Sequence, residues 1–274
     1  MTASSTRTPA KTAKVTRIDR DSDSTVQSLT RAMQLLELLA EDDEGYRLVD
    51  IAARSGLSSS TAHRLLTTLE QRQFVQSDRE TNLWYVGVRC FSVGAAFGRR
   101  RRIAHLALPV MRRLRDSTGE SINLGIADLG DIFFVTQVES RETMRAIGKP
   151  GFRAPLHGTA MGQSILAAMA EEDVLQYLRT YGLPKLTNNT IARASRLHET
   201  LGEVRRAGHA IDDEQNAVGL RCIAAAIRDE HGRPFGAISL VGPTQRIKSA
   251  DFAELGAVVR AAADEITAAY GGRF

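Results

Sequence analysis

Residues 48–73 read LVDIAARSGLSSSTAHRLLTTLEQRQ, and this stretch decides the fold of the N-terminal part of the chain. Leu48–Arg54 forms a short helical pattern, and Ser59–Gln73 forms a longer one with its apolar residues on one face. Gly56 can take the left-handed conformation that ends a helix, and Ser58 or the serine after it can cap the next helix. Two helices joined by so tight a turn are typical of a helix-turn-helix unit.

The second helix of this pair leaves a polar face opposite its apolar side. Small hydroxyl side chains and an arginine can form hydrogen bonds with base edges, and such a helix surface suits the major groove of DNA. The sequence therefore predicts DNA contacts from the capping serine and from the outward positions, which are Ser58, Ser59, Ser60, Thr61, His63, Arg64 and Thr67.

The flanking segments extend this unit to residues 25–87. Upstream, apolar residues at helical spacing run from Val26 to Ala40. Downstream, Phe74–Gln76 and Leu83–Val86 surround a polar tip, which is the pattern of a β-hairpin. We interpret the hairpin as the wing of a winged helix-turn-helix domain. Arg79 at its tip is the natural contact to a phosphate or the minor groove, although a loop arginine is more often simply solvated.

The positive charge of the chain is concentrated near its N-terminus. The net charge is +4, residues 1–24 hold five basic and three acidic side chains, and residues 25–102 hold eleven and nine. Basic groups at this end favour DNA binding through counterion release, but a solvated basic tail would give the same excess. Residues 1–24 lack apolar periodicity, and we expect them to be a disordered basic tail.

Length and composition limit the class of protein. A chain of 274 residues with 43% hydrophobic content suffices for two domains. It has no apolar run of membrane-spanning length and no secretory signal, so we expect a cytoplasmic protein with no membrane partner. Cys90 and Cys222 lie far apart, which predicts reduced thiols and neither a disulfide framework nor a zinc site.

The remainder of the chain predicts an α+β fold. Residues 88–102 indicate a linker helix, whose arginines at 99–102 form either a phosphate clamp or a solvated surface. Residues 103–274 mix helix and strand patterns, which favours a domain with a largely antiparallel sheet. The expected helices are 103–117, 160–170, 172–181, 194–207 and 250–270, and the expected strands are 121–127, 132–138, 209–212, 222–228 and 236–241.

Several ordered motifs carry a resemblance to a known family. Val26–Arg31 and Ser60–Thr68 resemble the DNA-binding helices of the isocitrate lyase regulator (IclR) family of transcription factors, which adds Arg31 to the candidate DNA contacts. Pro155–Ala160, Asp212–Glu214 and Gly219–Ala224, with Gly242-Pro243 and Arg246-Ile247, resemble its effector domain. The likeness covers nearly everything after residue 25 and is greatest to the glyoxylate-pathway and allantoin-pathway repressors.

This resemblance implies a winged-helix domain, a linker helix that mediates dimerisation, and an effector domain resembling GAF and profilin folds. It also implies a homodimer, or a homotetramer built as a dimer of dimers, that binds double-stranded operator DNA at inverted repeats. The expected function is a transcriptional regulator of carbon-metabolism genes, controlled by a small organic acid. Glyoxylate or a related 2-oxo acid is the first choice, and an allantoin-pathway or aromatic acid is the alternative.

A candidate effector site lies where Gly151–Thr159 leads into a predicted helix at Ala160. The free amides at a helix start, with the positive end of its dipole, suit a small carboxylate, although many helix starts hold no ligand. The resemblance implies that the amides of Ala160 and Met161 hold the carboxylate. The residues that it places around the rest of the effector are Ala146, Asp212, Leu220, Cys222 and Ser239.

Asp212 raises an electrostatic question, because an ionised carboxylate repels an anionic ligand. Hydrated glyoxylate could donate hydrogen bonds from its geminal hydroxyls to Asp212, but Asp212 could equally cap a turn. The chain departs from the family pattern at two places. Gln163 stands where many members have Lys, and Val241 stands where the glyoxylate-type relatives have Ser, so the ligand differs or the remaining donors suffice.

The sequence leaves two other classes of function to consider. Cys222, His157 and Asp212 could form a nucleophilic set or a metal site, but Cys222 sits in an apolar strand that tends to raise the pKa of its thiol. We therefore expect no enzyme, no metal and no cofactor. The remaining alternative is a small-molecule sensor whose winged helix docks a protein partner.

Overall fold

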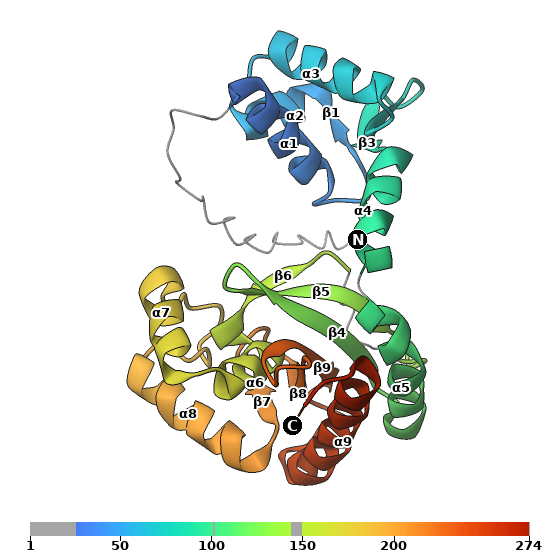
Figure 1. Ribbon diagram of the computed structural model, residues 1–274. Helices are drawn as coiled ribbons and strands as arrows, with labels where there is room; N and C mark the ends of the chain where they lie inside the picture. Colours follow the sequence, from blue (N-terminus) through green and yellow to red (C-terminus); the bar gives the residue numbers. More distant parts are fainter. Residues whose placement is uncertain (1–25, 101, 144–149, 274) are drawn as a thin grey trace, which may run out of the picture. The chain divides into compact units, whose positions relative to one another are not determined.

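A computed structural model describes residues 26–100, 102–143 and 150–273 of the chain (Figure 1). The chain divides into two compact units, residues 1–96 and residues 97–274. The predicted tail at residues 1–24 and the predicted effector contact Ala146 lie outside the described residues. Within the described ranges, none of the helices is long and apolar enough to cross a membrane.

The N-terminal unit is a winged helix-turn-helix. Its three-stranded antiparallel sheet has the order β1-β3-β2. Three fully buried side chains, Leu35, Ile51 and Leu66, join its first three helices in one core, which Trp84 closes from the sheet. The elements are α1 (Gln27–Leu39), β1 (Tyr46–Arg47), α2 (Leu48–Ser55), α3 (Ser59–Gln71), β2 (Val75–Asp78), β3 (Leu83–Val86) and the start of α4 (Val88–Arg100).

The turn between α2 and α3 has the predicted chemistry. Gly56 adopts φ +67° after the end of α2, and the Ser58 hydroxyl accepts a hydrogen bond from the backbone N–H of Thr61. At its other end α3 stops at Gln71, two residues before the predicted end, because Gln73 has φ +60° and turns the chain into the wing. The predicted helix-turn-helix is confirmed, with a shorter second helix.

The C-terminal unit is built on one six-stranded sheet of order β6-β5-β4-β9-β8-β7, in which every pair of neighbours is antiparallel. This confirms the α+β fold with an antiparallel sheet. The sequence did not predict β6 of this sheet or β1 of the N-terminal sheet, because a strand of two or three residues is too short to show a pattern of alternation. The elements are α5 (Arg102–Thr118), β4 (Ser121–Asp128), β5 (Asp131–Val138), β6 (Arg153–Pro155), α6 (Ala160–Ala168), α7 (Glu171–Tyr181), α8 (Ala194–Ala207), β7 (Ala210–Asp213), β8 (Leu220–Arg228), β9 (Pro234–Pro243) and α9 (Phe252–Tyr270).

Alternation along the strands divides this sheet between two cores. Ile223 and Ile227 of β8 pack in the cluster that contains α5 and α9, whereas Ala224 between them packs in the cluster that contains α6, α7 and α8. Figure 1 shows the two groups of helices on either side of the sheet. Cys222 also packs in the second cluster, so the predicted effector residues of β8 lie on the α6 side.

Candidate DNA interface and effector site

The start of α3 is held by a compact group of hydroxyls. The Ser58 Oγ accepts from the Thr61 N–H at 3.2 Å and lies 3.1 Å from the Ser60 Oγ and 2.9 Å from the Thr61 Oγ1. These bonds satisfy a backbone donor that the helix itself cannot satisfy. The hydroxyls of Ser58 and Thr61 are therefore engaged in the cap, and the three serines from Ser58 to Ser60 are all exposed.

Beyond the cap, α3 presents a polar face to solvent. His63 and Arg64 are exposed and Thr67 is half-buried, as the sequence predicts for groove-facing positions. Among the described residues, the Arg64 side chain has no ion-pair partner, so its guanidinium is available for a ligand. The His63 ring also meets the Trp84 ring edge to face, with centroids 6.3 Å apart. His63 thus has a packing role in addition to its predicted contact.

The sequence reasoning missed one residue on this face. Gln71 is exposed and lies seven residues after Arg64, so two helical turns bring it to the same side of α3. Glutamine can form two hydrogen bonds with adenine in the major groove. The spacing of Ser60, Arg64, Thr67 and Gln71 was a signal that could have found it. Arg31, the remaining predicted contact, lies on α1, outside both α3 and the wing.

The wing tip is ordered by Asp78. Its Oδ1 accepts from the Glu80 N–H at 2.8 Å and its Oδ2 accepts from the Thr81 hydroxyl at 2.8 Å. The Thr81 hydroxyl and the Glu80 amide lower the pKa of Asp78, because they bind its charged form. Arg79 lies between these groups and is exposed, so a defined turn presents the predicted phosphate contact.

The predicted effector residues of the sheet lie on adjacent strands. Asp212 of β7 pairs with Cys222 of β8, and Cys222 pairs with Val241 of β9. Ser239 lies two residues before Val241 on β9, and is therefore on the same face of the sheet. The fold thus brings together four residues that are up to 29 positions apart in the sequence. Leu220 is half-buried at the start of β8.

Helix α6 begins opposite this face. Thr159 is its N-cap, and the Thr159 Oγ1 accepts from the Gly162 N–H at 3.0 Å. In the described part of the chain, the backbone amides of Ala160 and Met161 have no acceptor, and both residues are buried. Buried amides at a helix start attract an anion, because the helix dipole adds positive potential there.

Asp212 is buried with an exposed fraction of 4%. Its Oδ1 accepts from the backbone N–H groups of Gln215 and Asn216, at 2.6 and 3.2 Å. Asp212 therefore caps a turn, which is the structural role that the sequence allowed for this residue. Burial raises the pKa of Asp212 to about 7, in spite of the two amide bonds that favour the charged form. Near neutral pH this carboxyl can thus donate a hydrogen bond.

The polar atoms next to Asp212 differ in reactivity. Burial, with a smaller contribution from the Asp212 carboxylate, raises the pKa of the Cys222 thiol to about 12, and the Ser239 hydroxyl opposes the rise. The Ser239 Oγ is buried and makes no hydrogen bond of normal geometry. An unsatisfied buried hydroxyl is unfavourable unless a ligand or water pairs with it. The site therefore offers a hydrogen-bonding group but no nucleophilic thiolate.

His157 is a structural residue next to the start of α6. The Tyr177 hydroxyl lies 3.0 Å from the His157 Nδ1 and accepts from its backbone N–H, and the Nε2 lies 3.0 Å from the Pro184 carbonyl oxygen. These partners assign the proton to Nε2, and burial lowers the pKa of the ring. His157 therefore makes three contacts with two neighbours, Tyr177 and Pro184. Among the described residues, no group of three His, Cys, Asp or Glu could hold a metal ion.

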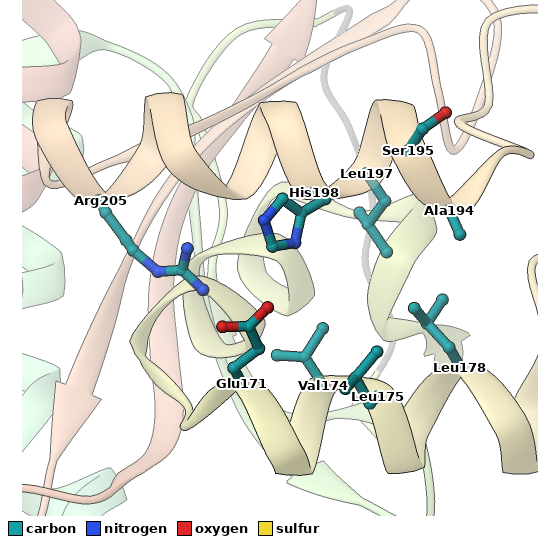
Figure 2. A pocket seen from close by; sticks show the side chains of 9 residues that line it. All are labelled: Glu171, Val174, Leu175, Leu178, Ala194, Ser195, Leu197, His198 and Arg205. Atoms are coloured by element: carbon teal, nitrogen blue, oxygen red, sulfur yellow. The ribbon is translucent and has the colours of Figure 1, made fainter.

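A separate groove lies between α7 and α8 (Figure 2). It has a volume of about 230 Å³, and Figure 2 shows a mainly apolar floor with Glu171, His198 and Arg205 at one end. None of the predicted effector residues lines it. The residues that line it are Glu171, Val174, Leu175, Leu178, Ala194, Ser195, Leu197, His198 and Arg205.

Comparison with protein families decides the identity of both units. Residues 28–79 match the IclR helix-turn-helix domain, and residues 96–268 match the family described as "Bacterial transcriptional regulator IclR C-terminal". The chain belongs to the IclR family. It is a transcriptional regulator and not an enzyme, and its helix-turn-helix unit binds DNA.

Known members of the family are similar to this chain over most of their length. The chain is 40% identical to the transcriptional repressor IclR of Escherichia coli over 249 residues, which are 90% of this chain and 91% of that protein. It is 34% identical to the repressor AllR of Escherichia coli over 89% of this chain and 90% of AllR. An IclR homologue from Microbacterium hydrocarbonoxydans, solved with 4-hydroxybenzoate, has the same fold, with a TM-score of 0.77, 24% identity and coverage of 89% and 99% of the two chains.

Proposed function

We propose that this IclR-family protein is a repressor of carbon-metabolism genes that binds an operator through α3 and the β2–β3 wing and responds to a small organic acid. The assignment of the DNA contacts to α3 rests on a row of polar side chains along one side of a capped helix, namely the exposed Ser60 and Arg64 and the half-buried Thr67. The E. coli relatives at 34% and 40% identity are named as repressors, which supports the same direction of regulation here.

The effector would bind between the start of α6 and the strands β7, β8 and β9. The free amides of Ala160 and Met161 would hold its carboxylate, and Asp212 and Ser239 would meet its other end. Repulsion between Asp212 and an anionic effector is avoided when the carboxyl is neutral, and a carboxyl with a pKa of about 7 can be neutral when the anion binds. A hydrated 2-oxo acid such as glyoxylate suits this mixture of donors and acceptors, with Cys222 and Leu220 beside it.

Another acid remains a specific alternative. Val241 is buried next to Cys222 and adds no polar group, so this part of the site suits a less polar ligand than glyoxylate. The homologue from Microbacterium hydrocarbonoxydans was solved with an aromatic acid, and the resemblance to the allantoin-pathway repressors supports an allantoin-pathway acid. Calorimetric titration of the protein with each acid separates these ligands. No heat with any 2-oxo acid would exclude the glyoxylate proposal.

We further propose that the active form is a homodimer, alone or within a tetramer, on an inverted-repeat operator. Exposed apolar side chains follow one side of α1 at Val26, Leu29 and Met33, with exposed fractions of 45–64%, and α4 exposes Val88 and Phe91. Exposed apolar stripes of this kind are typical of protein interfaces. A second copy is the proposed occupant, with α4 as the linker between domains at residues 25–87 and 103–274. Sedimentation of wild type and Phe91→Glu tests it, and a monomeric wild type would contradict it.

The experiment for DNA binding is a mobility-shift titration over a salt series. Phosphate contacts release counterions, so the affinity falls steeply with salt concentration, by about 0.9 in log K per unit of log salt for each contact. A winged helix that docks a protein instead would give no such dependence on a duplex. Because the target of a repressor is chromosomal DNA, such a regulator would act in the bacterial cytoplasm.

A further inference from the structure

Glu70 connects the recognition helix to the wing. It lies in the last turn of α3, and its Oε1 accepts two hydrogen bonds from one wing residue, Ser77. The backbone N–H of Ser77 donates at 3.1 Å, and the Ser77 hydroxyl donates at 2.5 Å. Both residues are half-buried. A single carboxylate oxygen thus holds the main chain and the side chain of β2.

The second strand of the wing, β3, contacts α3 at the residue that pairs with Ser77. Ser77 pairs across the hairpin with Trp84 of β3, and the Trp84 ring packs edge to face against His63 of α3. His63 and Glu70 are seven residues apart, which places them two turns apart on one side of the helix. The helix α3 therefore contacts both strands of the wing through the cross-strand pair Ser77 and Trp84.

The presence of the acidic residue Glu70 in a DNA-binding unit requires a physical explanation. A negative charge near DNA phosphates lowers affinity, because it opposes the attraction that basic groups provide. Hydrogen bonds to an ionised carboxylate are roughly twice as strong as those between neutral groups. Two such bonds to Ser77 account for Glu70 at this position.

The contact lies close to the group that the wing presents. Ser77 is two residues before Arg79, and the intervening Asp78 orders the tip through Glu80 and Thr81. We infer that Glu70 is a positioning residue, which orients the wing so that Arg79 reaches the DNA backbone while Arg64 lies in the major groove. This inference rests on the proposed DNA-binding function, and it adds a residue that itself touches no DNA.

The test uses the full chain and a duplex that the wild-type protein selects from a random pool. Glu70→Ala is expected to weaken binding about tenfold, which corresponds to the loss of one charge-assisted hydrogen-bonded contact. The footprint should shrink at its flanks, where the wing lies, and remain at its centre. The slope of log K against log salt should fall by about 0.9, as expected for the loss of one phosphate contact.

Matched variants separate positioning from charge and from folding. Glu70→Gln keeps the acceptor oxygen and should retain the wild-type footprint, and Ser77→Ala keeps only the amide bond and should fall between Glu70→Gln and Glu70→Ala. Glu37→Ala removes an exposed acid of α1 in the same unit and serves as the control. Thermal unfolding checks that each variant is folded. If Glu70→Ala is not, Ser77→Ala carries the test.

Three results would overturn the inference. These are an unchanged footprint and salt slope in Glu70→Ala, a Glu70→Gln variant as defective as Glu70→Ala, and tighter binding by both variants, which would show that Glu70 acts by repulsion alone. Failure of the wild-type protein to select any duplex is a different outcome. It would contradict the proposed DNA-binding function itself.

Discussion

The polar groups of the proposed recognition face on α3 and those of the proposed effector site lie in opposite environments. On α3, Arg64 and His63 extend into solvent from a helix whose apolar side is buried. In the effector site, Asp212 and Ser239 are buried between a helix and a sheet, and the carboxyl of Asp212 has a pKa far from its usual value. An exposed polar row suits a ligand that is itself large, charged and hydrated, whereas buried polar atoms suit a small ligand that can replace water and reach them.

This difference also appears in how each site is assembled. The DNA-facing residues of α3 come from one helix of 13 residues, so local periodicity determines which of them share a face. The proposed effector residues come from α6 and from three strands, β7, β8 and β9, which pair antiparallel with one another. Changes in one unit should therefore leave the other site intact, and the predictions below test that independence.

The largest expected effect follows from truncation of one side chain in the core of a single unit. Leu66→Ala, which truncates a fully buried side chain of the N-terminal unit, should lower the free energy of unfolding of that unit by about 2–5 kcal/mol. DNA binding should be lost, and calorimetric binding of the acid should remain. Leu240→Ala in the C-terminal core is the matched control and should show the reverse. Loss of both activities in either variant would show that the units do not fold independently.

The second effect in size is loss of a base contact. Arg64→Ala should weaken specific binding by about 1–3 kcal/mol, the range for a good arginine contact to a base, and should relax sequence preference. Quantitative footprinting on the selected duplex measures both. Arg113→Ala removes an arginine that is exposed in the C-terminal unit and should change neither. Undiminished protection with Arg64→Ala would remove this residue from the DNA interface.

The effector site should respond to pH through Asp212. The buried carboxyl holds its proton up to a pKa of about 7, and an anionic effector binds the protonated form better because the ionised form repels it. Affinity should therefore be constant below about pH 6 and fall up to about tenfold per pH unit above pH 7. Asp212→Asn keeps the acceptor for the turn and should remove this dependence. A wild-type affinity that rises above pH 7 would exclude a neutral Asp212.

The smallest expected effect concerns ligand choice. Val241→Ser introduces, opposite Cys222 of β8, the residue that the family resemblance implies for glyoxylate-type regulators. One added hydrogen bond should raise affinity for glyoxylate by about 0.5–1.5 kcal/mol and lower affinity for aromatic acids. Competition calorimetry with the two ligand classes measures the ratio. An unchanged ratio would show that position 241 does not select the effector.

Much of the N-terminal unit was predictable because its signals are local. Gly56 and Ser58 mark the turn by their own conformational and capping preferences, and the structure confirms both. The end of α3 was misplaced by two residues, because the left-handed conformation of Gln73 depends on how the wing packs. The contact between Glu70 and Ser77 left no signal in the sequence, since a glutamate in the last turn of a helix is usually solvated.

The effector site was predictable only in part. Asp212, Cys222 and Ser239 were named through the family resemblance, and the strand register shows that they share one face of the sheet. Nothing in the sequence indicates that Asp212 is buried deeply enough to titrate near pH 7. That property comes from desolvation by side chains that are distant along the chain.

The sequence alone determined the order of the helices and of the longer strands, the helix-turn-helix and the polar face of α3, because periodicity and capping act over a few residues. Only the tertiary structure decided which polar atoms are buried, which amides at α6 stay free, and how α3 holds the wing. Those features depend on long-range pairing and desolvation, and both arise only when distant segments pack against one another.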